Sequence, residues 1–154
     1  MIQNCPSMDA SFPNGGSWPP NLIELYLGVL KKPMSEWGPQ NFPTSLVTLT
    51  LSGGDVSSFS EDLLPSSLTR LGLYEFEELE SISKGLQCLT SLQHLIIHQC
   101  PKMMHLPETL LPSLLSLHIS ESPKLEERCR RRGRGSYWPL ISHIPCIKIN
   151  FESI

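Results

Sequence analysis

The chain has 154 residues, of which 40% are hydrophobic and 18% charged, and its formal net charge is −3. This composition indicates one folded domain, and the small net charge does not favour a polyanion or a membrane surface as partner of the whole chain. The five cysteines form no Cys-x-x-Cys pair, so neither a disulfide framework nor a zinc site is indicated. No apolar run is long enough to span a bilayer, and residues 1–6 lack the features of a signal peptide. We therefore expect a cytoplasmic location in a reducing environment, with the nucleus or the membrane periphery as alternatives.

One apolar pattern recurs along the chain at nearly fixed intervals. In its most regular copy, Leu92 is followed by Leu95, Ile97 and Cys100. The first positions of the copies are Leu22, Leu46, Leu68, Leu92, Leu114 and, less regularly, Ile144. The first four intervals are 24, 22, 24 and 22 residues, which is typical of leucine-rich repeats, and the last is 30. The sequence therefore predicts a stack of repeats.

The spacing within one copy indicates a short strand with one buried side. Leu95 and Ile97 lie two residues apart and point to the same side of a strand, whereas the residues beside them point to the other side. One repeat cannot cover its own apolar side, so successive strands pair in parallel and Leu95 should touch Leu71 and Leu117. We therefore expect an α/β fold, a leucine-rich-repeat solenoid shaped as a horseshoe arc. It should have a concave parallel sheet of about six short strands and a convex side of loops and short helices.

The repeat frame predicts that the chain starts within a repeat. Ile2 and the Cys5-Pro6 pair match Ile97 and the Cys100-Pro101 pair, and no polar capping unit precedes Ile2. We therefore expect residues 1–154 to form a single leucine-rich-repeat domain that is truncated at its N-terminal side.

The segments between the predicted strands are rich in Pro, Ser and Gly, which predicts loops and single helical turns. Residues 83–89 are the best candidate for a short helix. Residues 124–154 are expected to form an atypical terminal repeat and cap. Scattered apolar side chains in the connecting segments should fill the convex side of the core: Phe12, Trp18, Met34, Trp37, Phe42, Leu79, Ile82, Met103 and Leu106.

Two charge runs interrupt the repeats. Residues 75–80 contain four Glu, and residues 128–134 contain five Arg. A solvated rim and a mobile solvated loop are the favoured interpretations, because charge runs are usually exposed. A contact between the arginine run and a polyanion is the alternative, although the run lacks interleaved aromatic side chains that could stack on bases.

Several stretches together carry a resemblance to a known family. They are Trp18-Pro19-Pro20-Asn21-Leu22, Leu64-Pro65-Ser66-Ser67-Leu68-Thr69, residues 84–92, Cys100-Pro101-Lys102, Leu106-Pro107-Glu108, Glu126-Glu127-Arg128-Cys129 and residues 137–145. Their texture is similar to the C-terminal leucine-rich-repeat region of plant intracellular nucleotide-binding leucine-rich-repeat disease-resistance proteins of the coiled-coil class. This resemblance implies a role in recognising pathogen molecules and in restraining an adjoining nucleotide-switch domain.

Two features depart from that family. The chain has no Gly-x-x-x-x-Gly-Lys-Ser/Thr loop, so it is not expected to bind nucleotide by the family's route. Ser122 stands where the family often has Cys before Pro, and we expect this change to be tolerated.

The histidines and nucleophilic side chains form no catalytic or metal-binding pattern. His94 and His98 would lie about 13 Å apart on an extended strand, which is too far for both to bind one metal ion. No Ser or Cys lies in a Gly-x-Ser-x-Gly turn or beside a His and an acid in the repeat frame. We therefore expect no enzyme activity, cofactor, metal or small-molecule substrate.

The outward-pointing side chains of the strands form the candidate partner-binding surface. Ile96 is the expected centre, an apolar group beside the gap left by Gly72, although a single exposed aliphatic side chain is common on any surface. Aromatic and Arg side chains around an apolar centre are typical of a binding hot spot. The candidate residues are Glu24, Tyr26, Arg70, Tyr74, His94, Ile96, His98 and His118.

The sequence leaves three interpretations of function open. The favoured one is a protein-recognition module of a plant immune receptor, whose partner would be a pathogen effector, a host protein or the receptor's own nucleotide-binding domain. A generic leucine-rich-repeat adaptor, such as the substrate-recognition part of a ubiquitin ligase, is the second. The third is polyanion binding through the arginine run, although nucleic acid is not the expected partner.

Overall fold

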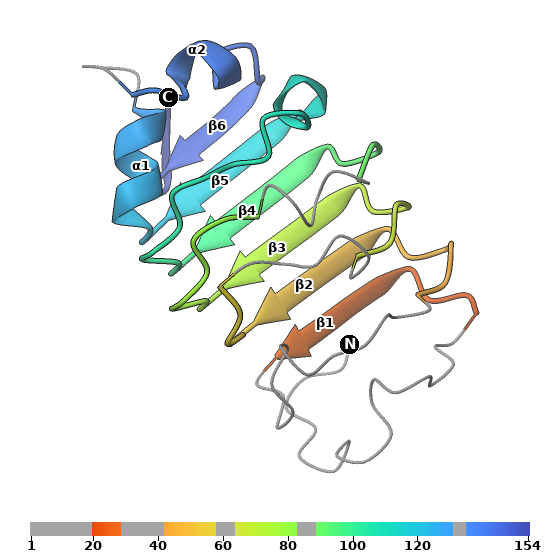
Figure 1. Cartoon of the computed structure of the whole chain (residues 1–154). Coiled ribbons are helices and arrows are strands. Elements are labelled where there is room, and N and C mark those ends of the chain that lie inside the picture. Colours follow the sequence, from red (N-terminus) through yellow and green to blue (C-terminus); the bar gives the residue numbers. More distant parts are fainter. Residues whose placement is uncertain (1–19, 29–41, 58–63, 83–88, 131–134) are drawn as a thin grey trace.

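The computed structural model describes residues 20–28, 42–57, 64–82, 89–130 and 135–154 of the chain. They form one sheet whose strands are stacked in chain order (Figure 1). β1 to β6 pair in parallel, and β7 pairs with β6 antiparallel. The strands are β1 (Glu24–Gly28), β2 (Thr48–Ser52), β3 (Arg70–Tyr74), β4 (His94–His98), β5 (Ser116–Ser120), β6 (Cys146–Ile149) and β7 (Glu152–Ser153).

The strand register follows the leucine frame of the sequence. Leu71 pairs with Leu95, and Leu95 pairs with Leu117, so equivalent positions of successive repeats lie side by side. The inward residues of β1 to β6 are buried, whereas the residues between them are mostly partly exposed or exposed. The predicted parallel sheet of a leucine-rich-repeat solenoid is therefore confirmed. The antiparallel β7 was not predicted.

Buried side chains from the connecting segments complete the core on the inward side of the sheet. The first leucines of the repeats contribute, as do the predicted Leu79, Ile82, Met103 and Leu106, each at most 1% exposed. Phe76, within the acidic run, is also fully buried. Phe42 is partly buried and packs against the core. The predicted Phe12, Trp18, Met34 and Trp37, and the predicted short helix apart from Leu89, lie outside the described residues.

The residue that follows each of β2 to β6 adopts the left-handed backbone conformation. These residues are Gly53, Glu75, Gln99, Glu121 and Asn150, with φ between 48° and 69°. The N–H groups of the first three each donate to the carbonyl of the last strand residue in the next repeat, at 3.0 Å. The turn after each strand therefore repeats from one unit to the next, and the side chains at this position emerge along one edge of the sheet.

The end of the described chain departs from the simple repeat. Helix α1 (Pro123–Cys129) follows β5, and the short helix α2 (Trp138–Ile141) precedes β6 (Figure 1). A 3-10 turn, η2 (Leu111–Ser113), lies before β5. Pro at the first helical position and Leu125 and Cys129 on the buried side are consistent with α1 beginning directly after Ser122.

Contacts of Arg128 correct one expectation from the sequence. Its Nη1 donates to the carbonyl of Met104 at 2.6 Å, and its guanidinium lies 5.3 Å from the ring centre of Tyr137. The hydroxyl of Tyr137 in turn accepts from the N–H of Leu106 at 3.2 Å. The arginine run therefore does not begin as a mobile loop, because Arg128 is packed at the end of α1. Arg131, Arg132 and Arg134 lie outside the described residues.

Ser122 and Glu126 join the last two repeats. The hydroxyl of Ser122 accepts from the N–H of Cys100 at 3.1 Å and donates to the carbonyl of Ser120. The carboxylate of Glu126, only 5% exposed, accepts from the N–H of Ser122 at 2.8 Å and from the side-chain amide of Asn150 at 2.6 Å. The Ser at position 122 is thus accommodated by hydrogen bonds.

Among the described helices, none is long and apolar enough to cross a membrane.

Candidate partner-binding surface

The outward side chains of the strands lie in three columns, and we call this side of the sheet the outward face. Residues of one column are paired from strand to strand. The first column is Glu24, Thr48, Arg70, His94, Ser116 and Cys146; the second is Tyr26, Thr50, Gly72, Ile96, His118 and Lys148; the third is Gly28, Ser52, Tyr74, His98 and Ser120.

Two tyrosines lie over glycines of their own strands. A Cβ atom on Gly28 would lie 2.9 Å from Cε1 of Tyr26, and one on Gly72 would lie 2.9 Å from Cε2 of Tyr74. Thr50 also lies close to Gly72, because its Oγ1 would be 3.3 Å from a Cβ atom at that position. The expectation of an open gap at Gly72 is therefore wrong, because the ring of Tyr74 and the side chain of Thr50 cover it.

Ile96 lies beside this covered glycine. Its strand partners in the same column are Gly72 and His118, and its side chain is partly exposed. It is the aliphatic residue of the second column, as expected. It does not lie beside an empty space, because the Tyr74 ring covers the neighbouring Gly72.

Aromatic rings continue along the outward face towards the end of the chain. The ring centres of Tyr74 and His98 are 5.7 Å apart, and those of His98 and Phe151 are 6.4 Å apart. Burial, and then a smaller electrostatic effect of Tyr26, raises the pKa of Tyr74. We call Tyr74, His98 and Phe151 the aromatic row.

Neighbouring polar groups hold the histidines of the outward face. Nδ1 of His94 lies 2.8 Å from Oγ of Ser116, and Nδ1 of His98 lies 2.8 Å from Oγ of Ser120. Nε2 of His98 is also 3.9 Å from a carboxylate oxygen of Glu121. These contacts fix the ring orientations. Among the described residues, no group of three or more His, Cys, Asp or Glu side chains could hold a metal ion.

His118 pairs with a residue that the sequence reasoning did not include. Its Nε2 lies 3.6 Å from Sγ of Cys146, which is partly exposed on the first column. Burial, followed by the charges of Lys148 and His94, lowers the pKa of His118. These effects favour the neutral form of His118, and its Nε2 faces the thiol of Cys146.

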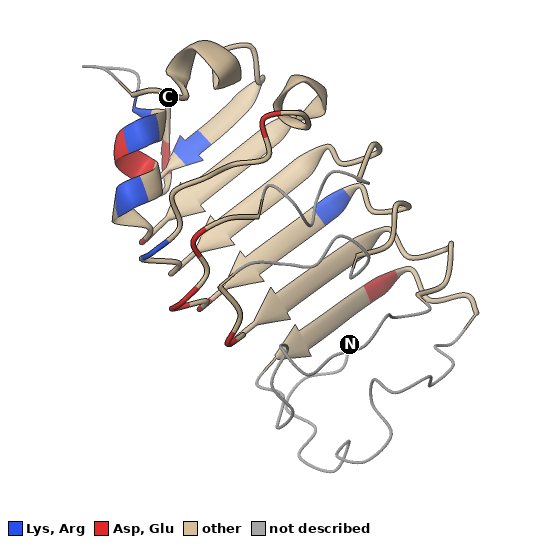
Figure 2. Cartoon of the chain, viewed as in Figure 1, with Lys and Arg blue, Asp and Glu red and all other residues tan. Residues whose placement is uncertain are grey.

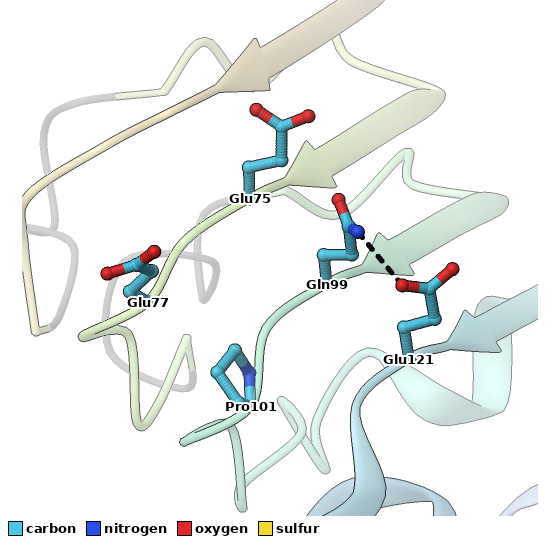
Figure 3. A pocket seen from close by; sticks show the side chains of 5 residues that line it. All are labelled: Glu75, Glu77, Gln99, Pro101 and Glu121. Atoms are coloured by element: carbon cyan, nitrogen blue, oxygen red, sulfur yellow. Dashed lines mark hydrogen bonds between the residues drawn. The ribbon is translucent and has the colours of Figure 1, made fainter.

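Acidic side chains gather at the edge of the sheet where the strands end. Figure 2 shows Asp and Glu positions in the turns that follow the strands. The strands β1 to β6 themselves carry only three charged residues, Glu24, Arg70 and Lys148. An open hollow of about 410 Å³ lies at this edge, and Figure 3 shows its lining. We call its lining residues the acidic edge: Glu75, Glu77, Gln99, Pro101 and Glu121.

The left-handed turns produce this arrangement. Glu75, Gln99 and Glu121 occupy the same position in three successive repeats, so their side chains lie in a line across the strand ends (Figure 3). Nε2 of Gln99 donates to Glu121 Oε2 at 2.9 Å, and the hydroxyl of Ser52 donates to Glu75 Oε2 at 3.4 Å. The amide of Gln99 therefore separates the two carboxylates and reduces their repulsion.

Most of the predicted site residues come together, but not all of them. Arg70, Tyr74, His94, Ile96, His98 and His118 lie on the adjacent strands β3, β4 and β5. Glu24 and Tyr26 lie on β1, two strands away from Arg70. The sequence reasoning missed Cys146 and Lys148, which the frame of Ile144, Ile147 and Ile149 could have placed outward. It also missed Phe151, which no sequence pattern marks.

The class of the protein follows from this geometry. A parallel sheet with one strand per repeat, a repeated turn after each strand and a leucine ladder buried on one side define a leucine-rich-repeat solenoid. No protein-family model matches the chain. No solved structure matches it either.

Among curated proteins, the chain is similar to a plant protein that carries a disease-resistance name. It is 33% identical over 118 residues to "Putative disease resistance protein At3g14460" of Arabidopsis thaliana. The matched region covers 73% of this chain but 8% of that protein, so the chain spans a small part of its relative's length. The chain is therefore a leucine-rich-repeat solenoid similar to part of a plant disease-resistance protein.

Proposed function

We propose that this chain is a non-enzymatic protein-recognition module of the kind found in plant immune receptors, and that its outward face binds the partner. The partner would be a pathogen effector, a host protein or the nucleotide-binding domain of the receptor itself. The similarity to a protein named for disease resistance supports the receptor context. The proposal that particular residues bind the partner is based on the composition of the outward face.

The observation that carries the proposal is the composition of that face between β3 and β5. Partly exposed Ile96 pairs with Gly72, so Arg70 and Tyr74 lie diagonally across from it on β3, and His98 lies two residues further along β4. Aromatic and Arg side chains around an apolar centre are enriched at binding hot spots, and rigid side chains lose little conformational entropy on binding. A face with this composition is suited to protein recognition.

The alternatives receive less support from the described residues. Polyanion binding would use the arginine run, but Arg128 is occupied by Met104 and Tyr137. No described feature favours an adaptor of a ubiquitin ligase over a receptor module.

The test is co-precipitation from leaf tissue of the tagged chain with a panel of pathogen effectors and host proteins. Ile96→Asp places a charge at the proposed centre and should abolish binding of the partner. Leu140→Asp is the matched control, because Leu140 is 43% exposed on α2, away from the strands. Arg70→Ala should weaken binding by at least about 1 kcal/mol.

Circular dichroism would confirm that each variant is folded. A partner that binds wild type, Ile96→Asp and Arg70→Ala equally well would move the site away from the outward face. A partner lost by Leu140→Asp but kept by Ile96→Asp would place the site near the end of the chain.

A further inference from the structure

We propose that the outward face takes a basic segment of a protein partner, with an apolar or aromatic side chain on the aromatic row and an Arg or Lys side chain at the acidic edge. This inference rests on the proposed function and names the chemistry of the partner.

Phe151 adds an exposed ring to the aromatic row. Phe151 is 76% exposed in the turn between β6 and β7, although it is one of the largest apolar side chains of the described chain. It is not isolated, because its ring lies 6.4 Å from that of His98, which lies 5.7 Å from that of Tyr74. A connected set of rings, partly exposed at Tyr74 and His98 and largely exposed at Phe151, is the kind of surface that a partner's apolar side chain buries.

The acidic edge lacks a basic residue of its own. None of its five lining residues is Lys or Arg. The nearby Lys102 is paired with Glu78, with its Nζ 2.6 Å from the carboxylate, and this contact raises the pKa of Lys102. Three carboxylates face the hollow, and within the described residues the amide of Gln99 and the hydroxyl of Ser52 donate to two of them. Such a hollow attracts cationic groups and repels anionic ones.

His98 joins the aromatic row to the acidic edge. Its ring contacts both Tyr74 and Phe151, and its Nε2 lies 3.9 Å from Glu121. An arginine is favoured by carboxylates through paired hydrogen bonds and by aromatic rings through cation–π attraction. A partner that places an apolar residue on the rings therefore places a neighbouring cationic residue within reach of the carboxylates.

A small cation fits this edge less well than an extended segment does. The backbones of Glu75 and Glu121 lie two strands apart, about 10 Å at the usual strand spacing, and among the described residues no group of three or more His, Cys, Asp or Glu side chains could hold a metal ion. A peptide can span this distance with about three residues. The geometry therefore points to a protein segment.

The test compares two fluorescent peptides that differ only in charge. One has the sequence Gly-Leu-Arg-Trp-Arg-Leu-Gly, and the other replaces both Arg by Glu. Fluorescence anisotropy with the whole chain at low salt should give saturable binding of the basic peptide. The acidic peptide should bind at least about tenfold more weakly, and the difference should shrink as salt rises.

Charge-reversal variants locate the effect. Glu121→Lys should weaken binding of the basic peptide at least about tenfold. Glu108→Lys makes the same change in net charge on the exposed segment between β4 and β5 and should change binding less than about twofold. Tyr74→Ala and Gly72→Ala should each weaken binding at least about threefold, the second because a Cβ at Gly72 displaces the Tyr74 ring.

The outcomes separate this inference from the proposed function. Equal affinity of the two peptides, or equal losses in Glu121→Lys and Glu108→Lys, would overturn the basic-segment inference. If a partner or peptide without basic residues binds and is lost in Ile96→Asp, the outward face is still the recognition surface but its preference for positive charge is wrong. The basic peptide could bind and lose affinity in Glu121→Lys while every protein partner binds Ile96→Asp as well as wild type. That result would show that Ile96 is not the centre of the recognition surface.

Discussion

The inward and outward sides of the strands differ in composition and in burial. The inward side of β1 to β6 carries only Leu and Ile, none more than 8% exposed. The outward side carries acidic, basic, aromatic, hydroxyl, thiol and aliphatic residues in no repeating order. Successive residues on a strand therefore serve separate purposes, because the inward residues stabilise the solenoid while the outward ones are free to vary in chemistry.

The strongest test of this contrast is an inward truncation. Leu95→Ala should lower the free energy of unfolding by about 2–5 kcal/mol, because the fully buried Leu95 pairs with Leu71 and Leu117 and the loss leaves a cavity. Urea denaturation followed by circular dichroism would measure it. An unchanged urea midpoint would contradict the inward assignment.

Glu126 carries a buried carboxylate among mostly apolar buried groups, and its removal tests whether buried hydrogen bonds also stabilise the fold. Glu126→Ala leaves the N–H of Ser122 and the amide of Asn150 without their acceptor, which should cost about 1–3 kcal/mol. The exposed neighbour Glu127 is the control, and Glu127→Ala should stay within about 0.5 kcal/mol of wild type. Equal losses in the two variants would show that the hydrogen bonds of Glu126 do not hold the last repeats together.

The pH dependence of stability tests the difference between the buried thiols of Cys100 and Cys129 and the outward thiol of Cys146. Burial raises the pKa of Cys100 to about 11 and that of Cys129 to about 12, from an ordinary value of 9.0. Well below pH 9 both thiols are protonated in the folded and unfolded chain, so their stabilising effect is fully present. As pH rises from 9 towards 11, the unfolded chain loses these protons first, and stability should fall by up to about 1.4 kcal/mol per pH unit for each thiol.

Urea midpoints between about pH 8 and about pH 10.5 would measure this slope. The double variant Cys100→Ala/Cys129→Ala should have a shallower slope, whereas the outward Cys146→Ser should keep the slope of wild type. Parallel curves for wild type and the double variant would contradict the assignment of the loss to buried thiols.

The smallest effect is expected on the outward side. Ile96→Thr keeps a β-branched side chain on the strand and removes only partly exposed apolar surface, so the free energy of unfolding should change by less than about 0.5 kcal/mol. Differential scanning calorimetry would compare it with Leu95→Ala. A loss as large as that of the neighbouring inward residue would remove the distinction between the two sides.

Much of the fold could be predicted from the sequence, because the inward residues repeat. The frame from Leu22 to Ile144 placed β1 to β6 and their register, since a one-residue shift would expose every inward leucine. Helix α1 had signals that the charge run obscured, namely Ser122, Pro123 and the apolar pair Leu125 and Cys129. The antiparallel β7 had no such signal.

Less of the candidate site could be predicted. The columns followed from the strand register, but the direction of each side chain did not. The rings of Tyr26 and Tyr74 lie over glycines, and Phe151 reaches His98 from a turn with no repeat pattern. The acidic edge depends on the left-handed backbone conformation of Glu75, Gln99 and Glu121. This conformation is uncommon for Glu and Gln, so the sequence did not predict it.

The glycine under Tyr74 has a consequence for how such a surface changes over generations. Gly72 is buried beneath the Tyr74 ring, yet its replacement by any larger residue would tilt that ring without touching the leucine ladder. A substitution at Gly72 could therefore change which partner the surface binds, although the partner itself would contact Tyr74 and not residue 72. Related gene copies should then inherit or lose Gly72 and Tyr74 together, and the same linkage should hold for Gly28 and Tyr26.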